Sequence, residues 1–197
     1  MSRWFWAGLL LLAVYLKWPQ DRIILGPGTL APAPPKQTAI QTPKPFNKGN
    51  YIISPLAEFE ITAKVLSRER YWLDKEADLS PIDFALGWQR MSDEDVLQHL
   101  SISQGQRWFR WQADQLSIPH AEISTSAANM HLIPADDRIR AALLAVKQGS
   151  IITLEGLLVA VNDANTQWQW RSSLTRSDTG AGACEIIWVT DITQHAP

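Results

Sequence analysis

Apolar and polar residues alternate along several stretches of the chain, and a period of two is typical of β-strands with one buried face. The clearest example is 59–65, where Phe, Ile, Ala and Val alternate with Glu, Thr and Lys. Four further stretches are expected to form strands: 107–111, 151–161, 167–174 and 183–190. Gly156 interrupts the alternation in one of them and predicts a bulge or a sharp bend there.

Helical signals are shorter. The clearest helix is expected to begin at Asp136 and Asp137, because acidic residues favour the positive end of the helix dipole. Apolar residues then recur every three or four positions until Gly149, which ends the pattern. A serine, a proline and an acid at 80–83 are typical of a helix start and predict a short helix over 80–86. A second short helix is expected over 92–100.

Together these elements predict a compact α+β domain over residues 51–197. Its sheet is expected to be mostly antiparallel, or a small β-barrel of the OB or SH3 type, with two or three short helices. Residues 19–50 contain seven prolines and four basic residues without apolar periodicity. This composition predicts a proline-rich linker.

Residues 1–18 are expected to form a membrane anchor helix. The run 4–16 is apolar without a break and lies between Arg3 and Lys17. A helix over 4–18 would be about 22 Å long, which is short for a hydrocarbon layer of about 30 Å. A cleaved signal peptide is the alternative, but no pair of small residues directly follows the run. We therefore expect an uncleaved, single-pass signal anchor in the inner membrane, with the C-terminal domain on the periplasmic or extracytoplasmic side.

Charge is unevenly distributed along the chain. Residues 1–50 carry six basic side chains and one acidic one, whereas residues 51–197 carry twelve basic and nineteen acidic ones. An acidic body repels phosphate backbones, so nucleic acid is a disfavoured partner. Cys184 is the only cysteine, which excludes an intramolecular disulfide.

The triplet Asp178-Thr179-Gly180 matches the active-site motif of aspartic proteases, which need two such carboxylates close together. The residues just before it are polar, no second copy occurs, and only 19 residues follow Asp178. We interpret the segment as a turn in which Asp178 caps backbone amides or pairs with Arg176.

Cys184 and His131 are the candidate catalytic pair. A cysteine nucleophile needs a base such as histidine, and Asn129 or Asp178 could orient that base. The alternative is that Cys184 is a small core residue on the apolar face of a strand. The four histidines lack the short spacings of a metal site, so neither a metal nor another cofactor is expected.

Aromatic and polar residues near 170 are candidates for binding. On a strand over 167–174, Trp168, Trp170 and Ser172 share one face, and Arg171 and Ser173 share the other. Together with the Arg-Trp-Phe-Arg-Trp stretch 107–111, they could form a stacking surface for a sugar, a peptide or a single strand of nucleic acid. One face of each strand must nevertheless be buried, so about half of these rings belong to the core.

Three stretches, 79–88, 126–135 and 172–185, together resemble a family of N-terminally anchored bacterial proteins of unknown function. The resemblance covers most of residues 51–197 and implies no activity.

Three functions remain open at this stage. The first is a tethered, exported binding or assembly module that recognises a partner protein or an envelope component through a site near the 172–185 loop and the 126–134 segment. Its binding residues would be Arg171, Ser172, Ser173, Arg176, Asp178, Asn129, Trp168 and Trp170. The second is a cysteine-dependent hydrolase or transferase that uses Cys184 with His131. The third is single-strand nucleic-acid binding through the aromatic and arginine residues of 107–111.

Overall fold

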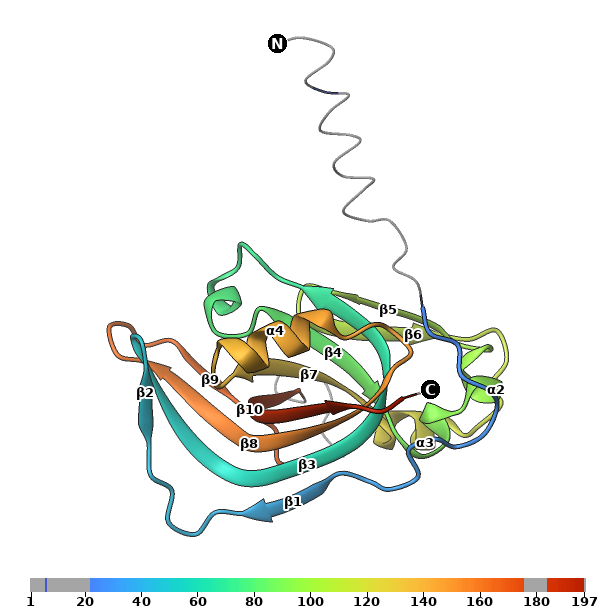
Figure 1. Cartoon of the computed structure of the whole chain (residues 1–197), viewed down its shortest axis with the longest axis horizontal. Coiled ribbons are helices and arrows are strands. Elements are labelled where there is room, and N and C mark those ends of the chain that lie inside the picture. Colours follow the sequence, from blue (N-terminus) through green and yellow to red (C-terminus); the bar gives the residue numbers. More distant parts are fainter. Residues whose placement is uncertain (1–5, 7–21, 176–183, 197) are drawn as a thin grey trace.

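The computed structural model describes residues 6, 22–175 and 184–196. Its main body is a strongly curved sheet with a few short helices packed around it (Figure 1). The strands are β1 (Lys36–Ala39), β2 (Phe46–Lys48), β3 (Tyr51–Arg70), β4 (Ile82–Gly87), β7 (Ala127–Pro134), β8 (Ile151–Asp163), β9 (Gln169–Arg171) and β10 (Glu185–Gln194). A separate hairpin consists of β5 (Ser101–Gly105) and β6 (Trp108–Gln112).

Five of these strands form a closed cycle. The order runs β3, β4, β7, β10, β8 and back to β3, because the long strand β3 pairs with both β4 and β8. All neighbours in the cycle are antiparallel except β7 and β10, which are parallel. The crossover from β7 to β8 contains α4 (Asp137–Ala145). The connectivity is therefore that of a small, barrel-like Greek-key sheet.

The sheet closes where strands bend. Pairing registers shift within β3, between Val65 and Ser67, and within β10, between Val189 and Asp191. Gly156 of β8 lies opposite Val189, and a Cβ atom there would lie 2.0 Å from the carbonyl oxygen of Trp188. The predicted irregularity at Gly156 is confirmed, although the extra residue is in the partner strand. Only a glycine allows the two backbones to approach this closely.

The interior of the cycle is apolar. Its largest buried cluster combines inward-facing residues from all five strands with two residues of α4, Ile139 and Leu143. A second cluster lies under the β5–β6 hairpin, α2 (Glu94–Leu97) and α3 (His120–Thr125). The helix expected after Pro134 is confirmed as α4, and Asp136 caps it by accepting a hydrogen bond from the Ile139 backbone N–H at 2.8 Å.

The helix expected over 80–86 is wrong. Residues 82–87 form β4, which is buried along its whole length between β3 and β7. The apolar run Ile-Asp-Phe-Ala-Leu is short and buried on both faces, a pattern that periodicity cannot separate from a helix. Short 3₁₀ segments flank β4, with η1 (Lys75–Asp78) before it and η2 (Gln89–Ser92) after it.

Residues 22–50, which were expected to act as a linker, lie along the domain. The Ile23 backbone N–H donates to the carbonyl of Gln148 at 2.9 Å, and Ala31 is buried. Further along, β1 and β2 both pair with β3. Polar backbone groups of this proline-rich segment thus find partners on the domain rather than in solvent.

The predicted fold class is wrong, and so is the predicted single-pass, inner-membrane localisation. The described residues form a sheet-rich domain with few helices, and none of those helices is long and apolar enough to cross a membrane. Apart from residue 6, the predicted anchor at residues 1–18 lies outside the described residues. The apolar run that suggested a transmembrane signal anchor therefore gains no support from the structure.

Candidate active site

A buried carboxylate, Asp83 on β4, is the centre of the most polar cluster in the described chain. Its side chain is fully buried, and a carboxylate in that position needs several hydrogen bonds or a cation. His131 Nδ1 lies 2.8 Å from Asp83 Oδ2, and Arg107 Nη1 donates to Asp83 Oδ1 at 2.9 Å. The Ser80 hydroxyl donates to Oδ1 at 3.3 Å. Both oxygens of Asp83 are therefore paired.

Strand register brings His131 and Cys184 together with Asp83. Asp83 and His131 are directly opposite each other on the antiparallel strands β4 and β7. On the other side of β7, the parallel strand β10 pairs its Ile186 with His131, and Cys184 lies two residues before Ile186. The His131 imidazole is hydrogen-bonded to Asp83, and Cys184 lies near enough to the same ring to raise its pKa. Since Nδ1 faces Asp83, Nε2 is the atom left for the thiol.

These contacts change the protonation of the imidazole. Burial lowers the pKa of His131, but hydrogen bonds to Asp83 and Cys184 and the charges of both groups raise it to about 9. Near neutral pH the ring is therefore held as an imidazolium between the carboxylate and the sulfur. Cys184, His131 and Asp83 thus occur in the sequence of roles that a nucleophile, a base and an orienting acid have in a catalytic triad.

Arg107 reaches Asp83 from a strained turn. Gln106 and Arg107 join β5 to β6 with φ angles of 54° and 67°, values that residues other than glycine rarely adopt. The Arg107 guanidinium also pairs with Asp74, Nη2 to Oδ1 at 2.7 Å, and lies 3.8 Å from the centre of the Tyr71 ring. Backbone strain at a buried guanidinium is frequent at functional sites.

The cluster borders a cavity of about 370 Å³. Its lining residues are Glu76, Arg107, Trp108, His131, Gln169, Trp170, Arg171 and Cys184. The Trp170 indole lies against the imidazole, with ring centres 4.6 Å apart. Cys184 is half-buried and lines the same cavity as His131. A cavity of this size accommodates a small organic substrate.

The structure brings some of the predicted site residues to this cavity and leaves others away from it. Cys184, His131, Trp170 and Arg171 line it. Asn129 does not orient the histidine directly, since its amide donates to the Arg107 carbonyl at 3.2 Å and weakly to Asp83 at 3.5 Å.

The other predicted binding residues have different surroundings. Trp168 packs edge-on against Tyr51. Ser172 and Ser173 are buried, and the Ser172 hydroxyl accepts a hydrogen bond from the Ile186 backbone at 3.1 Å. Arg176 and Asp178 lie outside the described residues. The serines therefore position the chain around Cys184 rather than face the cavity.

Sequence reasoning missed Asp83, and it considered Arg107 only as part of a stacking strand and not as the partner of a buried carboxylate. Asp83 was assigned to the start of a helix, where an acid has an ordinary capping role. The sequence does contain one signal for Asp83. It is an acidic residue inside a short apolar run, and if such a run is buried, the acid must have a hydrogen-bonding or charged partner.

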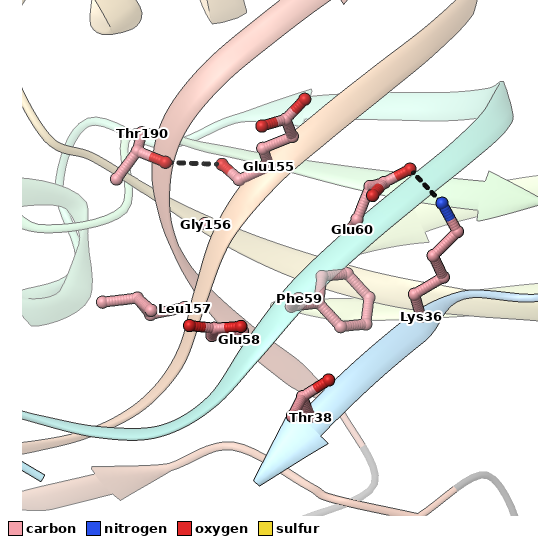
Figure 2. A pocket seen from close by; sticks show the side chains of 9 residues that line it. All are labelled: Lys36, Thr38, Glu58, Phe59, Glu60, Glu155, Gly156, Leu157 and Thr190. Carbon is pink, nitrogen blue, oxygen red and sulfur yellow. Dashed lines mark hydrogen bonds and ion pairs between the residues drawn. The ribbon is translucent and has the colours of Figure 1, made fainter. Parts of the chain in front are cut away.

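A second hollow has a different character (Figure 2). It measures about 400 Å³ and is formed by β1, β3, β8 and β10. Glu58, Glu60 and Glu155 line it, and Glu60 is paired with Lys36 at 2.9 Å. The described residues around this hollow are mainly carboxylates and threonines and include neither the thiol nor a histidine. The part of the chain that the structure describes also holds no group of three or more potential metal ligands.

Comparison of the chain with protein-family models, curated proteins and solved structures finds no match.

Proposed function

We propose that the protein is a cysteine-dependent acyl-transfer enzyme, a hydrolase or a transferase, with Cys184 as nucleophile and His131 as acid and base. One observation carries the proposal: a buried imidazole hydrogen-bonded to Asp83 lines the same cavity as the thiol of Cys184, which influences the imidazole's pKa. A cysteine that serves only as core packing needs neither the imidazole nor the open space.

The reaction follows from the order of the groups. The imidazolium form of His131 favours a thiolate at Cys184, and the thiolate attacks the carbonyl carbon of an ester, thioester or amide. The tetrahedral intermediate collapses as His131 donates its Nε2 proton to the leaving group, which leaves a thioester on Cys184. Water or another acceptor then attacks the thioester while His131 removes its proton, and the thiol is released.

Asp83 acts as a positioning residue. It holds Nδ1 of His131, fixes the ring so that Nε2 points to the sulfur, and stabilises the imidazolium. Arg107 in turn holds the other oxygen of Asp83 in an ion pair at 2.9 Å. Loss of either contact leaves a buried, unpaired charge and misplaces the base.

Formation of the thioester is the direct test. The purified protein is incubated with p-nitrophenyl acetate, and nitrophenol release is followed together with intact mass, since Cys184 is the only possible thiol. We expect a burst of nitrophenol and one acetyl group on Cys184. Cys184→Ser should lose the burst, and His131→Asn should slow it by about 10²- to 10⁴-fold.

A matched control is His120→Asn, which removes an exposed histidine from α3 and should leave the burst unchanged. Circular dichroism checks the fold of each variant. If Cys184 in the wild-type protein is not acylated, or is acylated at the same rate in His131→Asn, the proposal is wrong.

A further inference from the structure

We propose that the cavity selects acyl substrates that carry a carboxylate, and that Arg171 binds this carboxylate. This inference rests on the proposed function, because the carboxylate-bearing molecule is a substrate only if Cys184 is acylated. The anion site itself can be tested without catalysis.

Two arginines line the cavity, and they differ in whether an acidic side chain of the described residues neutralises them. Arg107 is engaged with Asp74 and Asp83. Arg171, on the edge strand β9, is exposed, and no acid lies within ion-pair distance of it among residues 22–175 and 184–196. A guanidinium beside a reactive group binds carboxylates through paired, charge-assisted hydrogen bonds.

The remaining lining residues define the rest of the substrate. Trp108 is 38% exposed although it is a large apolar residue, and together with Trp170 it offers apolar surface for a short carbon chain. Glu76 is the one carboxylate in the lining, and it is not paired with Arg171. A short acyl chain with a terminal carboxylate, as in a succinyl or glutaryl group, matches this arrangement.

Alkylation of the single thiol tests the anion site. Iodoacetate and iodoacetamide both transfer a carbon to the sulfur with loss of iodide, but only iodoacetate carries a carboxylate. The ratio of the two rates, iodoacetate over iodoacetamide, therefore reports attraction of an anion to Cys184. We expect the ratio to fall about five- to tenfold in Arg171→Gln and to fall with added salt in the wild-type protein.

Two variants act as controls. Arg138→Gln removes the same charge from an exposed position on α4 and should leave the ratio unchanged. Glu76→Gln removes the negative charge from the lining and should raise it. Equal ratios in wild type, Arg171→Gln and Arg171→Lys, with no effect of salt, would overturn the anion site.

Substrate preference tests the chemistry. Mono-p-nitrophenyl succinate should acylate Cys184 faster than p-nitrophenyl acetate. Arg171→Gln should abolish this preference, whereas Arg138→Gln should retain it. If alkylation shows charge selectivity but neither ester acylates Cys184, the proposed enzyme is wrong and the anion site stands. If both esters acylate the wild-type protein equally, the enzyme stands and the substrate class is wrong.

Discussion

Two buried ion clusters lie near opposite ends of β4, and only one of them has the form of an active site. Near one end, Lys64 of β3 is 1% exposed and pairs with Glu94 of α2 at 2.5 Å, and Arg22 also contacts Glu94. Towards the other end, Asp83 pairs with Arg107 and His131. Both clusters neutralise a charge that the fold has removed from water.

The surroundings of the two clusters differ. The cavity beside Lys64 is about 40 Å³, room for little more than a water molecule, whereas the one beside His131 is about 370 Å³. The Lys64 cluster contains no nucleophile, and the Asp83 cluster contains a thiol on its open side. A buried ion pair alone is therefore weak evidence of function. The larger cavity and the nearby thiol are the features that distinguish the Asp83 cluster from the Lys64 cluster.

The largest effect on stability is expected for Lys64→Ala. It leaves Glu94 without its buried partner and should lower the free energy of unfolding by about 3–5 kcal/mol, measured by urea denaturation. The double variant Lys64→Met, Glu94→Leu should recover most of this loss, because it removes both charges. Alkylation of Cys184 should be unchanged in the double variant. A change there would show that the two clusters are not independent.

The matching change in the other cluster is Asp83→Asn, which should lower the free energy of unfolding by about 3 kcal/mol and also slow the thiol. Without the carboxylate the pKa of His131 falls and the imidazolium is lost. We expect iodoacetamide to react about tenfold more slowly at pH 7 and at a nearly unchanged rate at pH 10, where a cysteine ionises without help. Equal slowing at both pH values would indicate a merely structural role for Asp83.

The pH dependence of stability should also distinguish the clusters. The pKa of His131 is about 9 in the folded protein and about 6.5 in an unfolded chain. The folded state therefore binds the proton more tightly, and the resulting stabilisation is complete below pH 6.5 and disappears as the pH rises to about 9. The loss should amount to about 3 kcal/mol in urea titrations. His131→Asn should flatten this slope, whereas the Lys64 and Glu94 double variant should retain it.

Much of the sheet could be predicted from the sequence, but the site could be predicted only in part. Alternation marked β3, and the acidic start marked α4. Cys184 and His131 could be proposed as a pair from the sequence because the chain has one cysteine and only four histidines that could act as its base. Asp83 was missed because its partners come from β7 and from the β5–β6 turn, and strand pairing between distant segments leaves no local pattern.

The smallest effect is expected for Arg22→Gln. The Arg22 side chain is 41% exposed and its contact with Glu94 is 2.9 Å, so solvent screens the pair and Lys64 still neutralises the carboxylate. The free energy of unfolding should fall by less than about 1 kcal/mol. Together with the large effect of Lys64→Ala, this small change would show that the loss in the free energy of unfolding arises mainly from removal of the buried cation. A loss as large as that of Lys64→Ala would mean instead that Arg22 holds residues 22–31 on the domain, and that the N-terminal segment and the Lys64 cluster unfold together.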